Sequence, residues 1–205
     1  MSLHRLLSLY QYARPEEVES GLYWYDSVGL TVRELASSYD VKLTVAAGVI
    51  AVLSPNVSWE TNLTDSRTVL STLTLGGHPE EITVSTYNSN KDKAISIVMT
   101  GNVFPYLSGP KVETFFHNLL GDYSEPCIDS HAINAWFGKR VEGSNISLRN
   151  RTTTIRKIRA DYIRAANTKG LTPAQFQATI WVMHQRRIAE GRIIGYERKG
   201  GIEHV

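Results

Sequence analysis

PYLSGPKVETFFHNLLGDYSEPCIDSHAINAWFG, residues 105–138, is the stretch on which the fold prediction depends. It opens with a tight turn around Gly109. It continues as an amphipathic helix, because its apolar residues recur at i, i+3, i+4 and i+7: Val112, Phe115, Phe116 and Leu119. Gly121 is a typical helix stop. Asp129 then precedes a second helical pattern, at the position of an N-cap. Lys111 and Asp129 are 18 positions apart, and the functional interpretation depends on whether they meet at one site.

Patterns on both sides of this stretch predict more helices. Residues 43–53 are apolar on all sides, which is typical of a buried helix or a buried strand, and their small residues favour the helix. Pro15 opens a second helix, which we expect Gly29 to divide in two. Residues 172–175, Thr-Pro-Ala-Gln, are typical of a helix start with an N-cap, Pro at N1 and Gln at N3. No confident strand pattern occurs, so we predict an all-α fold of about eight to ten helices.

Composition excludes several classes of protein. An apolar content of 42% in 205 residues is enough for a packed core, and no apolar run is long enough to span a membrane. The N-terminal sequence shows no cleavage site, so we expect a mature N-terminus and a cytoplasmic protein, of a bacterium or of a virus-infected host. A single cysteine, Cys127, excludes an internal disulfide and a cysteine-ligated iron–sulfur cluster. The six histidines lack metal-ligand spacing, and we expect neither a metal nor a cofactor.

Charge is unevenly distributed along the chain. The net charge is only +2, but residues 139–169 carry many basic residues against only Glu142 and Asp161. Such a local excess suits a polyanionic partner, although a solvated helix face is an equally good explanation. The residues that we select from this segment as contacts to a DNA backbone are Arg149, Arg151 and Arg156.

Four segments, taken in order, resemble the helix–hairpin–helix DNA glycosylase superfamily of the endonuclease III type. They are AGVIAVLSPNVSWETN (47–62), YNSNKDKAISI (87–97), LSGPKVETFF (107–116) and CIDSHAINAWFG (127–138). The resemblance implies one glycosylase-like unit over 1–205, built of two helical lobes, with double-stranded DNA as its partner and no obligate protein partner. The core lobe is expected at 41–140 with the hairpin at 105–112, the second lobe at 1–40 plus 141–195, and a frayed tail at 196–205.

The resemblance assigns catalytic roles to two residues. Asp129 matches the catalytic aspartate, which stabilises the positive charge on the sugar as the N-glycosidic bond breaks; its alternative role is simply to cap the next helix. Lys111 matches the lysine that forms a Schiff base in lyases. The hairpin keeps one glycine where the family usually has two, so Glu113 is the alternative residue at this position. We prefer Lys111 because its 18-residue separation from Asp129 resembles the family's own spacing.

The remaining expected contacts are with the phosphates and the flipped base. The hairpin, Leu107, Ser108, Gly109 and Pro110, is expected to bind a phosphate through its backbone and the following helix N-terminus; the alternative is a plain helix–helix turn. Asn56 matches the wedge that replaces a flipped base, and also suits an ordinary turn. Four residues are assigned to the base pocket, although aromatics at helical spacing also suit a core: Trp24, Tyr25, Trp59 and His131. His131 is expected to orient the Asp129 loop.

Three functions therefore compete. The first is a DNA glycosylase, with or without AP-lyase activity, that removes a damaged or modified base beside Asp129. The second is a viral base-hypermodification enzyme of the same fold, of the pyrophosphorylase or transferase type, that acts on a modified pyrimidine. The third is a non-catalytic helix–hairpin–helix DNA-binding module, which would keep the hairpin and the basic face but would not need Asp129.

Overall fold

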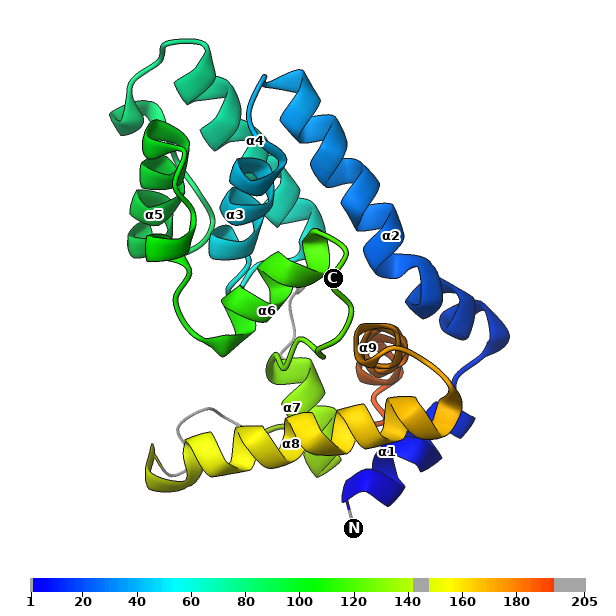
Figure 1. The fold of residues 1–205 in the computed structure, drawn as a ribbon. Coiled ribbons are helices and arrows are strands. Elements are labelled where there is room, and N and C mark those ends of the chain that lie inside the picture. The colour runs from blue at the N-terminus through cyan, green and yellow to red at the C-terminus, as the bar shows by residue number, and fades with distance from the viewer. Residues whose placement is uncertain (1, 142–147, 194–205) are drawn as a thin grey trace. The chain divides into compact units, whose positions relative to one another are not determined.

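The structure is a computed structural model that describes residues 2–141 and 148–193, with the side chains of 148–151 left out. This part of the chain is all-α, as predicted, and its nine α-helices fall within the expected number (Figure 1). The elements are α1 (Ser2–Gln11), α2 (Pro15–Ser38), α3 (Leu43–Leu53), α4 (Trp59–Thr74), the 3-10 turn η1 (Pro79–Glu81), α5 (Asn88–Thr100), the 3-10 turn η2 (Phe104–Tyr106), α6 (Pro110–Leu119), α7 (Ser130–Phe137), α8 (Leu148–Lys169) and α9 (Pro173–Ala189).

The chain forms two compact units, and α2 contributes to both. The first unit combines the residues up to Asp26 with those from Asp122 onward, and the second unit is Ser27–Gly121. Residues 122–140, which were expected in the core lobe, belong to the first unit. Lys111 and Asp129 consequently lie in different units.

The second unit is built around α3. Every residue from Val45 to Leu53 is buried, which confirms the helical alternative for this apolar segment, and α4, α5 and α6 all pack against α3. Gly48 permits close packing, because a Cβ atom there would lie 2.5 Å from Val103 Cγ1. Asn62 of α4 donates from Nδ2 to the Ile50 carbonyl at 3.0 Å, so the polar group that α4 buries against α3 is satisfied.

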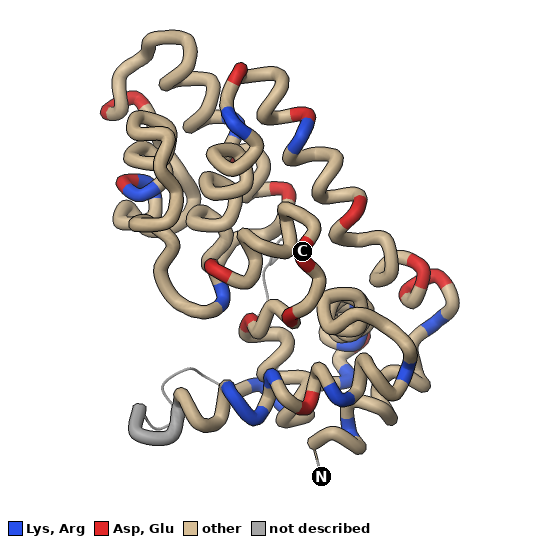
Figure 2. The backbone as a smooth tube through the Cα atoms, viewed as in Figure 1, with Lys and Arg blue, Asp and Glu red and all other residues tan. Residues whose placement is uncertain are grey.

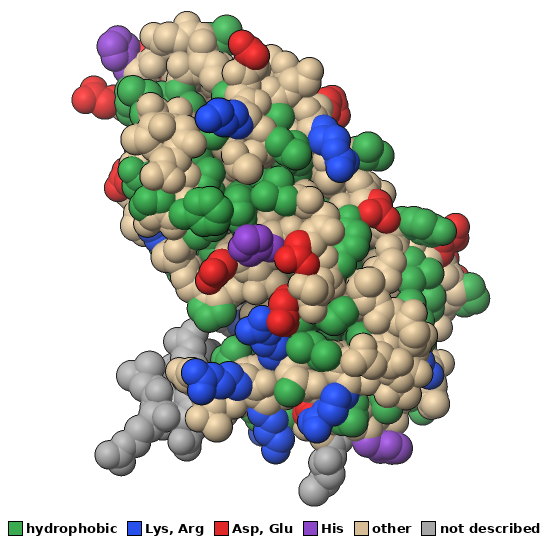
Figure 3. All heavy atoms as spheres, viewed as in Figure 1, with side chains coloured by type: hydrophobic (Ala, Val, Ile, Leu, Met, Phe, Trp, Pro, Cys, Tyr) green, Lys and Arg blue, Asp and Glu red, His purple; other side chains and the backbone are tan. Residues whose placement is uncertain are grey.

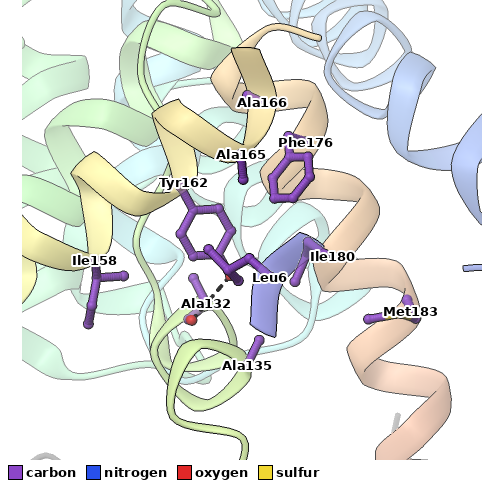
Figure 4. Close-up of a cluster of buried hydrophobic side chains, with 10 residues drawn as sticks. All are labelled: Leu6, Ala132, Ala135, Ile158, Tyr162, Ala165, Ala166, Phe176, Ile180 and Met183. Atoms are coloured by element: carbon purple, nitrogen blue, oxygen red, sulfur yellow. Dashed lines mark hydrogen bonds between the residues drawn. The ribbon is translucent and has the colours of Figure 1, made fainter. Parts of the chain in front are cut away.

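The first unit has its own hydrophobic core, contributed by α1, α7, α8 and α9. Figure 4 shows Tyr162 of α8 at its centre. The Tyr162 hydroxyl donates to the Ala132 carbonyl at 3.1 Å, which joins α8 to the first turn of α7. Burial first, and the nearby negative charge of Asp129 second, raise the pKa of Tyr162 well above its usual value, so the phenol stays protonated and keeps this bond.

Two local features differ from what the sequence patterns indicated. The helix at Ser2–Gln11, whose Leu6 is fully buried in the first unit, has no counterpart among the predicted elements. Its apolar face is stabilised by α8, α7 and α9, which sequence periodicity cannot reveal. Gly29 does not divide the second helix either, since α2 runs unbroken from Pro15 to Ser38. A helix-interior glycine costs only about 1 kcal/mol, which tertiary packing offsets.

In the described part of the chain, no single helix is long and apolar enough to cross a membrane. The bent pair of α2 and α3 meets the criteria only by length and composition, and α3 is the buried central helix of the second unit.

Candidate functional site

The loop that leads to Asp129 is held by three helices of the first unit. The Tyr123 hydroxyl donates to Asp26 of α2 at 2.6 Å, and the Tyr123 carbonyl accepts from the Ala174 amide of α9 at 3.3 Å. Glu125 pairs with Arg159 of α8 at 2.5 Å. These contacts define the position at which α7 begins.

Asp129 is the N-cap of α7, as predicted. Its Oδ1 accepts from the Ala132 amide at 2.7 Å, which satisfies one of the open N–H groups at the helix start. Oδ2 has no hydrogen-bond partner among the residues that the structure describes, and the side chain is only partly buried. One oxygen is therefore committed to the fold, while the other remains available to a ligand.

The first unit contains a group of aromatic and histidine side chains in mutual contact. We call it the aromatic–histidine cluster, and its members are Trp24, Tyr25, His131, Trp181 and His184. Its rings form a chain of contacts. Trp24 meets Tyr25 edge-on, with ring centroids 4.7 Å apart, and lies 5.6 Å from Trp181 of α9. Trp181 lies 6.4 Å from His131, and His131 lies 5.5 Å from His184. Three of the four expected pocket residues thus belong to one cluster.

The two histidines are joined more closely than their rings alone indicate. His131 Nδ1 and His184 Nδ1 are 3.3 Å apart, within hydrogen-bonding distance. Burial first, and the charges of His131 and Arg187 second, lower the pKa of His184 to about 3. His184 is therefore neutral at physiological pH, so one of its ring nitrogens carries a proton and the other is an acceptor.

Close packing of α2 on α9 positions the tryptophans of the cluster. A Cβ atom on Gly21 would lie 2.4 Å from the Thr179 Cα and 2.5 Å from its amide nitrogen. Only glycine allows the two helices to approach this closely. Trp24 lies one turn after Gly21, and Trp181 lies two residues after Thr179, so this approach brings the two indoles into contact.

Lys111 and Asn56 lie in the second unit, near the end of α3. Lys111 Nζ donates to Ser54 Oγ at 2.5 Å and lies 5.4 Å from the Phe115 ring centroid. Asn56, two residues after Ser54, is exposed and adopts a positive φ of 62°; its Nδ2 donates to the Tyr87 hydroxyl at 2.7 Å. The fourth expected pocket residue, Trp59, begins α4 in the same unit.

The predicted hairpin occupies the segment between α5 and α6 of the second unit. Gly109 is the N-cap of α6 with φ 86°, a conformation that favours glycine, and Pro110 is the first helical residue. Ser108 accepts from Lys93 of α5 at 2.6 Å. Leu107 precedes them and is half-buried, and Glu113, the alternative to Lys111, is exposed on α6.

The basic helix is α8, in the first unit. Basic positions lie along much of its length (Figure 2), and on the face drawn in Figure 3 their side chains gather over this helix. Arg156 is exposed, as expected of a backbone contact, whereas the side chains of Arg149 and Arg151 lie outside the described residues. Arg164 pairs with the buried Asp161, so part of this charge serves the fold.

Sequence reasoning missed two members of the cluster. Neither Trp181 nor His184 was selected as a site residue from the sequence. Both face residues more than 50 positions away in the sequence, His131 for His184 and Trp24 for Trp181, and no local pattern carries that information. The one available signal was the helical spacing of Gln177, Trp181 and His184, which puts them on neighbouring turns of α9.

The chain matches one protein family over residues 2–188, DUF7178, a family of unknown function. The chain belongs to this family. No curated protein and no solved structure matches it. The family spans both units, so the site in the first unit and the hairpin in the second both lie within its limits.

Proposed function

We propose that this protein is a DNA glycosylase of the helix–hairpin–helix, endonuclease III-like type, which removes a damaged or modified base from double-stranded DNA. The observation that carries the proposal is the state of Asp129. Its carboxylate is fixed by one oxygen at the N-terminus of α7, its other oxygen has no partner among the described residues, and His131, which contacts Trp181 of the aromatic–histidine cluster, lies two residues later on the same helix.

The chemistry needs a negative charge at a fixed position. As the bond between the sugar and the base breaks, positive charge develops on the sugar, and a preorganised carboxylate stabilises that charge without reorganisation. The same carboxylate takes a proton from the attacking water. The hydrogen bond from the Ala132 amide holds the Asp129 side chain in one orientation. The half-buried indoles of Trp24 and Trp181 are the rings on which a base would stack.

The second unit supports DNA binding by its own features. The N-terminus of α6 begins at a glycine in the left-handed region, which leaves backbone N–H groups at a helix start suited to a phosphate. The exposed Asn56 lies in a tight turn after α3, as expected of a side chain that enters a duplex. Arg156 adds a basic contact from the first unit.

We propose in addition that Lys111 gives the protein AP-lyase activity. An amine that attacks the sugar carbon must lose its proton, and it then forms a Schiff base that borohydride reduces to a stable protein–DNA adduct. Borohydride trapping on an abasic duplex should fall to background in Lys111→Ala and persist in Lys93→Ala, a lysine that also donates to a serine of the second unit. Trapping that persists in Lys111→Ala would contradict the lysine assignment but not the glycosylase assignment.

Base release tests the proposal itself. The purified protein is incubated with duplexes that contain uracil, oxidised pyrimidines, 8-oxoguanine or hydroxymethylated pyrimidines. We expect release from at least one duplex, its loss in Asp129→Asn, and its retention in Asp122→Asn, an exposed aspartate of the same loop. If the wild type releases no base but turns over a pyrophosphorylated base, the hypermodification alternative replaces this proposal. Salt-sensitive binding without turnover would favour the binding module.

A further inference from the structure

We propose that His131 is the proton donor to the leaving base and that His184 is a positioning residue that holds the His131 imidazole. This inference rests on the proposed glycosylase function and names a second catalytic group for it. It comes from the His131–His184 contact, which joins α7 to α9 and which the reaction described above does not use.

The C1′–N bond breaks, and its electron pair goes to the base, which takes the proton from His131 Nε2. The oxygen of a water molecule bonds to C1′, and the water proton goes to Asp129. The products are the free base, an abasic sugar, neutral His131 and protonated Asp129, and exchange with solvent restores both groups. General acid assistance of this kind typically contributes about 10²- to 10⁴-fold in rate.

Geometry assigns the two nitrogens of His131. Its Nδ1 faces His184 Nδ1 at 3.3 Å, so Nε2 is the nitrogen left for a substrate. The ring also lies edge-on to Trp181, with centroids 6.4 Å apart. His131 is the second residue of α7 and Asp129 is the N-cap of the same helix, so both side chains project from one helix start. Donor and carboxylate are thereby placed on one rigid element.

Because His184 is neutral, the hydrogen bond between His131 Nδ1 and His184 Nδ1 is present both before and after His131 gives up its proton. When His131 is protonated, its Nδ1–H donates to the Nδ1 lone pair of His184. After His131 has lost its Nε2 proton, Nδ1–H is still present and the same bond remains. No proton has to move between the two rings, so the imidazole keeps its orientation in both states. Burial, which holds the pKa of His184 to about 3, prevents His184 from becoming a competing donor.

The titratable groups that act on Asp129 or on the His131–His184 pair lie on three elements. Asp129 precedes α7, His184 and Arg187 belong to α9, and Tyr162 of α8 is kept protonated by burial and by Asp129. The other groups that contact α7 lie at its far end, at Trp136 and Phe137, and they are Arg5, Lys157 and Asp161.

The pH dependence of base release tests this assignment, on whichever duplex the wild type cleaves. A donor must be protonated, so the single-turnover rate should fall on the alkaline side. His131→Gln should lower the rate on the order of 100-fold and abolish the alkaline fall, whereas His4→Gln, an exposed histidine of α1, should change neither. His184→Asn keeps a polar group near the Nδ1 position and should retain the wild-type profile. His184→Leu removes that group and should shift the profile.

If His131→Gln keeps the wild-type rate and profile while Asp129→Asn is inactive, the donor assignment is overturned and the glycosylase function stands. If His184→Leu folds, as judged by circular dichroism, and keeps the wild-type profile, the positioning role of His184 is overturned. If the wild type releases no base from any duplex, the proposed function fails, and the donor assignment fails with it.

Discussion

Replacing Gly21 by alanine tests the packing that builds the site. The added Cβ would lie within 2.5 Å of both the Cα atom and the amide nitrogen of Thr179. Those are backbone atoms of α9, so no side-chain rotation relieves the contact, and one helix has to shift. Gly29 is the matched control in the same helix, because a Cβ there would meet its nearest atoms, Arg33 Nη1 and the Leu119 carbonyl oxygen, at 3.5 and 3.7 Å.

The two substitutions should have opposite signs. Alanine is favoured over glycine in a helix interior by about 1 kcal/mol, and this gain applies at both positions. At Gly21, overpacking costs about 1–3 kcal/mol, and contact with backbone places it near the upper end. We therefore expect Gly21→Ala to lower the free energy of unfolding by about 2 kcal/mol, and Gly29→Ala to raise it by about 0.5–1 kcal/mol.

Urea unfolding followed by tryptophan fluorescence measures both changes, since three of the four tryptophans lie in the first unit. For a chain of this size, a loss of about 2 kcal/mol corresponds to a melting temperature lower by roughly 4–8 °C. Because the α2–α9 contact also places Trp24 beside Trp181, Gly21→Ala should slow base release in addition. A Gly21→Ala protein as stable as Gly29→Ala would refute the close approach of the two helices.

Two further predictions concern the first unit. Thr172→Ala removes the capping box of α9 and should cost about 1 kcal/mol in urea unfolding, whereas an unchanged midpoint would contradict that cap. Burial alone would raise the pKa of Glu17 and of Asp161, but hydrogen bonds and neighbouring arginines lower both. The stabilisation is present above the unfolded-state pKa and is lost as the pH falls below about 4. Glu17→Gln should flatten that acid loss, and an equally steep acid loss would contradict the Glu17–Arg186 pair.

The elements that sequence predicted well are those with local signals. The capping box at Thr172 and the N-cap at Asp129 each depend on a residue three positions away, and both are present. The buried helix at 43–53 was predicted from its own apolar composition. In each case the physical cause lies within one or two turns of chain.

The features that could not be predicted from the sequence are those that depend on residues far away along the chain. α1 is stable because Leu6 is buried against helices more than 100 positions away. The cluster around His131 likewise requires α9 to lie beside α2 and α7, which the pattern of neither helix specifies. The 18-residue separation of Lys111 and Asp129 resembled a family spacing, but spacing does not determine which unit a residue joins, and the two residues lie in different units.

The direct test of the central claim separates the charge of Asp129 from its capping role. Asparagine and serine are both good N-caps, so Asp129→Asn and Asp129→Ser should keep the wild-type unfolding midpoint within about 1 kcal/mol while removing the carboxylate. Single-turnover base release, measured on the best duplex of the panel, should fall by a factor on the order of 10² or more in both variants. Release at the wild-type rate by either stable variant would show that Asp129 only caps α7, and would contradict the account.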